Sequence, residues 1–142
     1  MAKALIDTNI LYDFFAKTTL VTEAKKILET LQTVVISQAV VYELATGLKN
    51  ILGSHLTSKL IAEIYCIDSQ SDQFEILRIE EKDEKLALEI MAKYDSNSQR
   101  KDFTMVDAIL IAQAQHHKLQ LFTTDERMTH FDQKLAKIVK PY

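Results

Sequence analysis

Short apolar runs alternate along the chain with longer segments whose apolar residues recur every three or four positions. The runs are rich in aliphatic and β-branched side chains and predict strands at Ala4–Ile6, Thr33–Ser37, Phe74–Ile79, Leu119–Phe122 and Ala136–Lys140. The segments between them have the spacing of amphipathic helices. Strands that alternate with helices predict a single α/β domain over residues 1–142, with a mostly parallel sheet of four to five strands.

Turn and capping residues separate the helical segments. A break at Gly53–Ser54 divides one long apolar pattern, and the polar stretch Asp68–Asp72 predicts a loop. A short helical or irregular piece is expected at Met128–Phe131. The predicted helices follow Asp7 and then cover Thr22–Leu31, Ser37 to about Leu48, Leu56–Ile67, Glu81–Tyr94 and Met105–His116.

Composition narrows the class of protein without identifying it. The 142 residues are 47% hydrophobic and 26% charged, with only two glycines and one proline, which suits long helices better than a sandwich of tight hairpins. A net charge of −3 excludes a globally basic nucleic-acid binder, although local basic side chains can still hold phosphates. The single cysteine excludes an internal disulfide. With no apolar run long enough to span a bilayer, we expect a cytoplasmic protein that binds no membrane.

Acidic residues follow several of the predicted strands. Asp7 comes directly after the first strand and Asp125 after the fourth, while Glu43 lies early in the helix that follows the second strand. Asp107 lies in the first turn of the helix that leads into the fourth strand. Ligands of α/β sheets bind at the carboxyl ends of the strands, so the fold could bring all four carboxylates to one edge.

Each of these acids also has a purely structural interpretation. Asp7 and Asp125 could cap the helices that follow them, and taken alone Asp7 is better explained as a cap. Thr104 and Asp107 are spaced like a capping box, and Glu43 could be a solvated helix residue. A cluster of the four would repel itself, however, and would persist only around a cation.

Carboxylate oxygens suit Mg²⁺, with Mn²⁺ as an alternative, and the sequence has no Cys/His set at zinc spacing. A Mg²⁺ centre with open water positions is the usual apparatus for hydrolysis of phosphodiester bonds. Thr8, Asn9, Ser37 and Thr123 are candidates for orienting the carboxylates through hydrogen bonds.

Four motifs, in this order, resemble those of PIN-domain ribonucleases, and in particular the VapC-type toxins of bacterial toxin–antitoxin pairs. They are Asp-Thr-Asn within Ile6–Leu11, the mid-chain Glu43 after a strand, Asp-Ala-x-x-Ile-Ala within Asp102–Ala112, and Thr-Thr-Asp within Phe122–Asp125. The resemblance covers nearly the whole chain. It implies a three-layer α/β/α sandwich with a parallel sheet, usually assembled as a homodimer.

The resemblance also implies an activity and a set of roles. Asp7, Glu43, Asp107 and Asp125 would be the catalytic acids that bind Mg²⁺ for endonucleolytic cleavage of RNA. Thr123 would match the hydroxyl that often precedes the last acid by two positions. A cognate antitoxin would cover the acidic site with its tail.

An acidic metal site needs basic side chains nearby to hold RNA, although each such residue could equally be solvated surface charge. Asp102 is one further acid near the predicted site and could replace or supplement one of the four. Contacts specific to this chain's substrate or antitoxin are expected in Asn50–Asp72. The candidates for RNA binding are Arg100, Lys101 and Arg127, with Lys93 and Lys49 further out.

Two other classes of protein stay open at this point. A non-catalytic PIN-like module could bind RNA or protein, but a complete set of four acids argues against it because an idle cluster costs stability. A phosphoryl-accepting α/β protein would need an Asp after the third strand, or Asp-x-Asp after the first. The chain has neither, since Asp7-Thr8-Asn9 follows the first strand.

Overall fold

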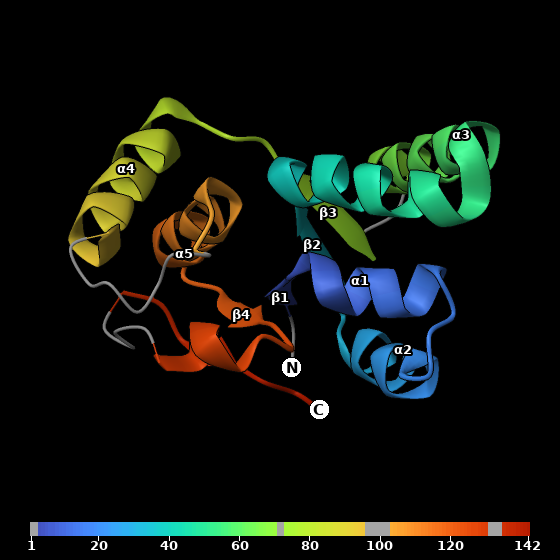
Figure 1. The fold of residues 1–142 in the computed structure, drawn as a ribbon, viewed down its shortest axis with the longest axis horizontal. Coiled ribbons are helices and arrows are strands. Elements are labelled where there is room, and N and C mark those ends of the chain that lie inside the picture. Colours follow the sequence, from blue (N-terminus) through green and yellow to red (C-terminus); the bar gives the residue numbers. More distant parts are fainter. Residues whose placement is uncertain (1–2, 71–72, 96–102, 131–134) are drawn as a thin grey trace.

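The computed structural model describes residues 3–70, 73–95, 103–130 and 135–142. Within them a parallel sheet carries helices on both faces (Figure 1). The elements in chain order are β1 (Lys3–Ile6), α1 (Thr8–Phe15), α2 (Val21–Thr30), β2 (Thr33–Ser37), α3 (Gln38–Gln70), β3 (Phe74–Leu77), α4 (Glu81–Asp95), α5 (Met105–His117), β4 (Gln120–Phe122), the 3₁₀ helix η1 (Glu126–His130) and β5 (Ile138–Val139).

The order of the strands explains the layers. The sheet runs β3-β2-β1-β4-β5, and every described pairing is parallel. The chain therefore extends the sheet from β1 in one direction and then returns to extend it in the other. Because parallel crossovers are right-handed, this reversal places α1, α2 and α3 on one face and α4 and α5 on the other (Figure 1). The predicted three-layer α/β class is confirmed.

The two central strands are buried on both faces. Ala4, Leu5 and Ile6 of β1 are fully inaccessible to solvent, and all five residues of β2 are buried. Strands covered on both faces are continuous apolar runs instead of alternating ones. This is why the sequence marks these two strands so clearly. The reversal of strand order beside β1 is the position where ligand sites form in open α/β sheets.

Boundaries differ from the sequence prediction at the ends of β3 and α3. β3 ends at Leu77 because the N–H of Ile79 donates to the side-chain oxygen of Gln38 at 3.2 Å and not to a strand. The predicted loop at Asp68–Asp72 is wrong over its first half, since α3 continues to Gln70 and residues 71–72 lie outside the described part. Polar composition alone did not mark the helix end, because propensity is a weak signal.

The predicted break at Gly53 is confirmed. Gly53 has φ +81° and ψ 165°, a conformation that a side chain would strain, and it divides α3 into two arms. The arms fold back on one another at the right of Figure 1. Most of the segment in which we expected contacts specific to this chain, Asn50–Asp72, thus lies in the second arm of a helical hairpin, and its last two residues lie outside the described part.

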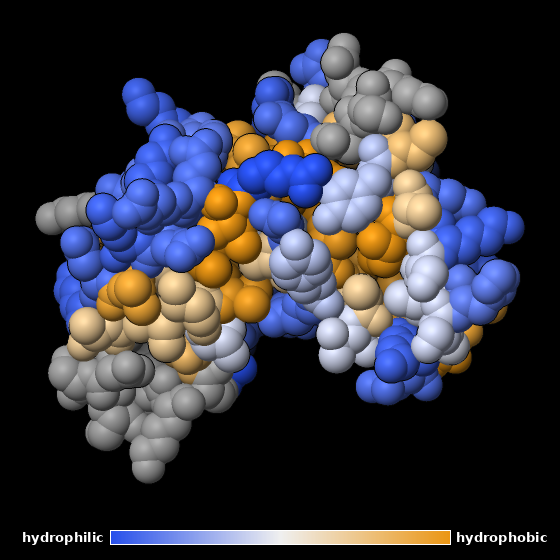
Figure 2. All heavy atoms as spheres, turned by 90° about the horizontal axis from the view of Figure 1, so that it is seen from above, coloured by the Kyte–Doolittle hydropathy of each residue, from blue (hydrophilic) through white to orange (hydrophobic). Residues whose placement is uncertain are grey.

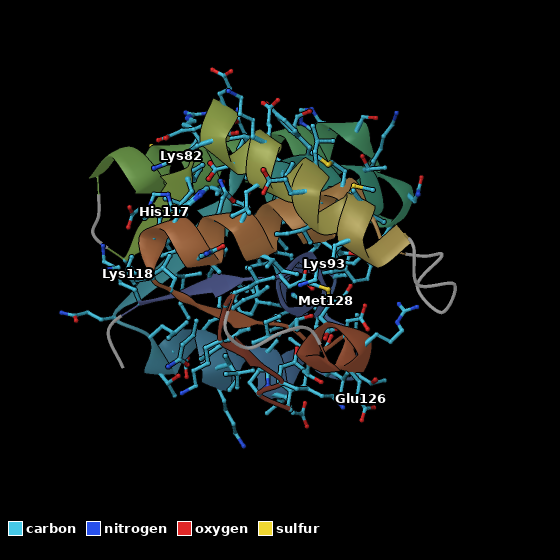
Figure 3. The ribbon with its side chains drawn as sticks, turned by 90° about the vertical axis from the view of Figure 1, so that its left-hand side faces the viewer. Lys82, Lys93, His117, Lys118, Glu126 and Met128 are labelled. Atoms are coloured by element: carbon cyan, nitrogen blue, oxygen red, sulfur yellow. The ribbon has the colours of Figure 1, made fainter. Side chains whose placement is uncertain are left out.

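The outer surface is mixed in character. In the view from above, hydrophilic side chains cover most of the periphery and hydrophobic ones reach the surface toward the middle (Figure 2). From the side, α4 lies over α5, with Lys82 and Lys93 near its opposite ends (Figure 3). No helix among the described residues is both long and apolar enough to cross a membrane.

Candidate active site

Asp7 links β1 to α1 and is held by two hydrogen bonds. Its Oδ1 accepts from the N–H of Thr8 at 2.7 Å, so the predicted helix cap is present. Its Oδ2 accepts from the hydroxyl of Thr123 at 2.6 Å. The two residues meet because Ile6 pairs with Phe122 in the sheet, which brings the ends of β1 and β4 together. Asp7 is 5% exposed, and its carboxylate is thereby fixed at the carboxyl edge of the sheet.

Glu43 reaches the same edge from α3. The hydroxyl of Thr8, in the first turn of α1, donates to Oε1 of Glu43. Thr8 is buried, whereas Glu43 is exposed on its helix. One residue pair, Asp7-Thr8, therefore contacts both β4 and α3, which explains why the start of α1 organises this part of the molecule.

Asp107 occupies the third position of α5 in a complete capping box. The hydroxyl of Thr104 accepts from the N–H of Asp107 at 3.2 Å, and Oδ2 of Asp107 accepts from the N–H of Thr104 at 3.0 Å. The predicted capping box is confirmed. It fixes the side chain at the start of the helix, with one carboxylate oxygen left over.

Asp125 follows β4 and is paired with an arginine. The guanidinium of Arg127 donates to both carboxylate oxygens of Asp125, at 3.0 and 3.1 Å. The hydroxyl of Thr123 accepts from the N–H of Asp125 at 3.0 Å while it donates to Asp7. A single buried hydroxyl thus couples the positions of two acids.

All four predicted acids line one cavity of about 430 Å³. They come from the start of α1, the first arm of α3, the start of α5 and the segment after β4, so the fold brings together residues that lie far apart in the sequence. Its lining in the described part of the chain is Asp7, Thr8, Asn9, Tyr12, Glu43, Gly47, Thr104, Asp107, Asp125 and Arg127.

The acids of this cavity act on each other electrostatically. Burial raises the pKa of Asp7 to about 6, against the opposing hydrogen bonds from Thr123 and Thr8, and the nearby charges of Asp107 and Glu43 raise it further. Burial also raises the pKa of Asp107, and the charges of Glu43 and Asp125 add to the effect while the bonds with Thr104 oppose it. Negative charge is therefore concentrated at this edge, and Arg127 offsets it at Asp125.

The donor set fits a hard divalent cation, since every ionisable group of the lining except Arg127 and Tyr12 is a carboxylate. Among the described residues, however, no three His, Cys, Asp or Glu side chains are grouped closely enough to hold a metal ion as they are placed. Arg127 engages both oxygens of Asp125, whereas Thr8 engages only one oxygen of Glu43, which agrees with the orienting role expected of this hydroxyl.

The other site residues predicted from the sequence lie at the cavity, elsewhere in the fold, or outside the described residues. Asn9 lines the cavity and is exposed, whereas the buried hydroxyl of Ser37 accepts from the N–H of Ala39 at 3.2 Å at the start of α3. Ser37 is not among the cavity lining in the described ranges. Arg127 lies at the cavity but is paired with Asp125. Arg100, Lys101 and Asp102 lie outside the described residues.

Two lining residues were not predicted from the sequence. Tyr12 lies one helical turn beyond Thr8, and Gly47 lies one turn beyond Glu43, so each shares a helix face with a predicted residue. A Cβ on Gly47 would meet the ring of Tyr12 at 3.4 Å. The i, i+4 spacing was the signal that could have found both.

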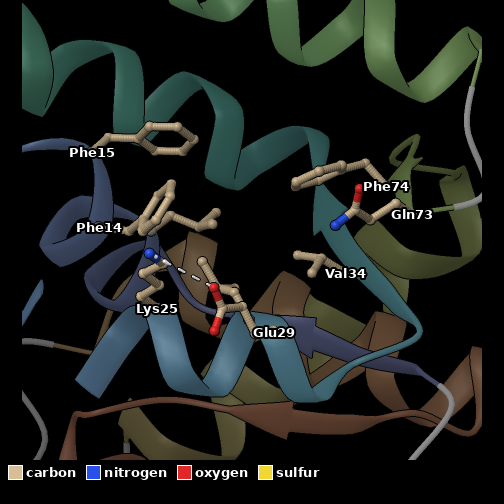
Figure 4. A pocket seen from close by; sticks show the side chains of 9 residues that line it. Phe14, Phe15, Lys25, Glu29, Val34, Gln73 and Phe74 are labelled. Carbon is tan, nitrogen blue, oxygen red and sulfur yellow. Dashed lines mark ion pairs between the residues drawn. The ribbon is translucent and has the colours of Figure 1, made fainter. Parts of the chain in front are cut away.

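A second cavity, of about 210 Å³, has a different character. It lies where α1 and α2 meet β2 and β3, and its walls are mainly apolar, with Phe14, Phe15, Val34 and Phe74 among them (Figure 4). The only charged side chains in its described lining, Lys25 and Glu29, form an ion pair at 3.8 Å. It offers no group suited to hydrolysis, so the candidate chemistry stays with the acidic cavity.

A doubly wound α/β fold with an acidic cavity at the reversal of strand order defines the class of protein. The PIN domain family model matches residues 4–134, and the chain belongs to the PIN-domain family. No curated protein matches it.

Solved structures agree with this family. A chain of a toxin–antitoxin complex from Klebsiella pneumoniae matches at 26% identity and TM-score 0.70 over 98% of both chains. VapC20 of Mycobacterium tuberculosis, described as a sarcin–ricin-loop-cleaving toxin, matches at 19% identity and TM-score 0.74, over 89% of this chain and 92% of that one. A DNA-bound VapBC complex from Salmonella typhimurium matches at 16% identity and TM-score 0.70 over the full length of both chains. The last two likenesses establish the fold.

Proposed function

We propose that the chain is a divalent-metal-dependent endoribonuclease, with Mg²⁺ as the expected ion and Mn²⁺ as an alternative. The observation that carries the proposal is the convergence of Asp7, Glu43, Asp107 and Asp125 on one cavity. Membership of the PIN-domain family supports it, and so does the described activity of the structurally similar VapC20 toxin.

The four acids would hold the cation, and a bound cation would supply a water of lowered pKa as nucleophile and stabilise the leaving oxygen. The protein's part is positioning. Thr123 fixes Asp7 and the backbone of Asp125 through one hydroxyl, and Thr104 fixes Asp107. The guanidinium of Arg127, which lies at the cavity, would bind a phosphate group of the substrate.

The test is cleavage of total RNA by the purified chain with Mg²⁺, with Mn²⁺ and with a chelator. We expect cleavage only with metal, and its loss in Asp7→Asn, which keeps the size of the side chain. Glu89→Gln is the matched control, because Glu89 is an exposed acid of α4 outside the cavity. An inert wild-type protein under all metal conditions would instead support a non-catalytic PIN-like binding module.

We further propose that the chain is the toxin of a toxin–antitoxin pair and acts as a homodimer in the cytoplasm. The support is that several similar structures are toxin–antitoxin complexes, including those from Klebsiella pneumoniae and Salmonella typhimurium. Expression of the chain alone should arrest growth, and co-expression of a small DNA-binding protein encoded beside it should relieve the arrest. Growth unaffected by the chain alone would count against the toxin assignment. Light scattering of the purified chain tests the dimer.

A further inference from the structure

The helical hairpin of α3 carries a third pocket, which is open to solvent and separate from the acidic cavity. Its volume is about 280 Å³, and it lies between the two arms that meet at Gly53. The first arm contributes Ala45, Thr46 and Lys49, and the second contributes Ser54, Thr57 and Ser58. The described lining therefore has one cation, four hydroxyls and no carboxylate, which is the reverse of the acidic cavity.

Thr57 gives this pocket a polar group without a partner. Thr57 is 5% exposed, and its hydroxyl makes no hydrogen bond among the described residues. A buried hydroxyl without a partner costs about 1–3 kcal/mol, so native proteins seldom leave one unless something external satisfies it. Thr57 is one of the residues that line the pocket, and a ligand that reached its hydroxyl there would supply the missing partner.

The backbone adds further donors. Because Gly53 interrupts α3, the second arm begins anew at Ser54, and the first N–H groups of a helix have no partner within it. Such a helix start carries partial positive charge and binds anions. Ser54 and Thr57 lie in this first turn, and Ser58 follows directly.

Lys49 adds a full positive charge to the partial positive charge of the helix start. It is exposed on the first arm, and neither it nor Ser54 nor Ser58 makes a hydrogen bond or ion pair in the part of the chain that the structure describes. Thr46 differs, because its hydroxyl already donates to the carbonyl of Tyr42 at 3.1 Å. Lys49 and three hydroxyls with free donors thus converge with a helix start, a set that matches the oxygens of a phosphate group.

We propose that this pocket binds a phosphate group of the RNA backbone outside the cleavage site. The inference rests on the proposed ribonuclease function. Glu43 and Gly47 face the acidic cavity, while Thr46 and Lys49 line the hairpin pocket, so one helix contacts both. Lys49 lies six residues beyond Glu43, about 9 Å along the helix axis. RNA held at the metal site could therefore continue along α3 into the pocket.

The pocket itself is tested with inorganic phosphate, which needs no RNA and no metal. In chelator-containing buffer, we expect phosphate to shift the backbone amide resonances of Ser54, Thr57 and Ser58 saturably. Lys49→Met should weaken this binding about tenfold, and Thr57→Val about fivefold. Lys59→Met is the matched control, since Lys59 is exposed on the second arm but lies outside the pocket. Absent saturation, or equal weakening by Lys49→Met and Lys59→Met, overturns the proposal.

Thr57→Val also separates binding from folding. Removing an unpartnered buried hydroxyl should leave the free energy of unfolding unchanged or raise it, although phosphate binding weakens. A loss of stability in this variant would show that the hydroxyl serves the fold, and would overturn its assignment to the ligand.

The RNA assignment is tested by the affinity of the Asp7→Asn protein for a short single-stranded RNA at several salt concentrations. Adding Lys49→Met should lower affinity and reduce the slope of log K against log salt by about 0.7, as one lost phosphate contact requires. Phosphate binding with no effect of Lys49→Met on RNA would overturn the RNA assignment and point to a carboxylate-bearing protein partner. If the wild type cleaves no RNA, the proposed function fails, but the phosphate experiment still decides on the pocket.

Discussion

Asp83 and Asp107 hold the same position in two consecutive helices, and they differ in what lies beyond them. Each is the third residue of its helix, and each accepts from the backbone N–H of the residue before the helix at 3.0 Å. The second oxygen of Asp83, which is fully buried, accepts from Nδ1 of His116 on α5 at 2.7 Å. The second oxygen of Asp107 lies at a cavity shared with Asp7, Glu43 and Asp125.

The difference shows that the same capping motif can contribute to stability in one helix and to a candidate active site in another. At the start of α4 a buried carboxylate is satisfied on both oxygens and joins two helices, so its contribution is to stability. At the start of α5 the same capping geometry places a carboxylate among other carboxylates, where burial and, to a lesser extent, repulsion raise its pKa. A region that keeps such unfavourable charge is a candidate for function.

The largest expected effect is on RNA cleavage, which should depend on Asp107 and not on Asp83. Asp107→Asn keeps an oxygen for the N–H of Thr104, so the helix start should survive. It removes one of the proposed metal ligands, and RNA cleavage should fall a hundredfold to a thousandfold, since metal-assisted charge stabilisation is worth several kcal/mol. Rates under single-turnover conditions, with far-ultraviolet circular dichroism as the fold control, measure this. Cleavage within a fewfold of wild type would remove Asp107 from the proposed site.

The next effect concerns pH and the metal-free protein. With a folded-state pKa of about 6 against 3.8, native Asp7 binds more protons than the unfolded chain between pH 4 and 6. The free energy of unfolding should therefore fall as pH rises through this window, by about 3 kcal/mol, and stay low above it. The raised pKa of Asp107 also lowers the free energy of unfolding as pH rises. Urea unfolding in chelator gives the slope, which Asp7→Asn should reduce to the part that Asp107 contributes; an unchanged slope in that variant contradicts the origin assigned to it.

Asp83→Asn should show the opposite profile to Asp107→Asn. The amide keeps an oxygen for the backbone of Glu80 but loses its charge opposite His116. Because His116 is partly exposed, we expect a loss of about 2 kcal/mol, below the range for a fully buried pair. Urea unfolding measures it, and RNA cleavage at a permissive temperature should match wild type. Loss of cleavage in a folded Asp83→Asn protein would break the contrast between the two regions.

The capping geometry at Asp107 could be predicted because it is local. Thr104 and Asp107 are three residues apart, a spacing that encodes both hydrogen bonds. Asp7 was likewise predicted from the end of an apolar run, and β2 from its β-branched residues. These predictions depend on neighbours in the chain, which the sequence displays directly.

The partners across the fold could not be predicted in the same way. The contact of Asp7 with Thr123 depends on Ile6 pairing with Phe122, and the His116–Asp83 contact depends on α4 lying on α5. No periodicity within a segment reveals either arrangement. Their positions after strands and at helix starts indicated the four acids, and the family resemblance implied their roles. Neither revealed that Thr8 engages Glu43 or that Arg127 engages Asp125.

The smallest expected effects come from substitutions of the two glycines. They test whether the glycine at position 47 lowers the stability of the chain but keeps the acidic cavity wide. Gly47 has helical neighbours, and a Cβ there would lie 3.4 Å from the ring of Tyr12, so Gly47→Ala should stabilise the chain by about 0.5–1 kcal/mol. Because the added methyl group narrows the cavity beside Glu43, cleavage should fall. Gly53→Ala, at φ +81°, should instead destabilise by at least about 1 kcal/mol. Thermal unfolding compares the two, and a destabilised Gly47→Ala would mean that the ring of Tyr12 cannot shift and that Gly47 serves packing alone.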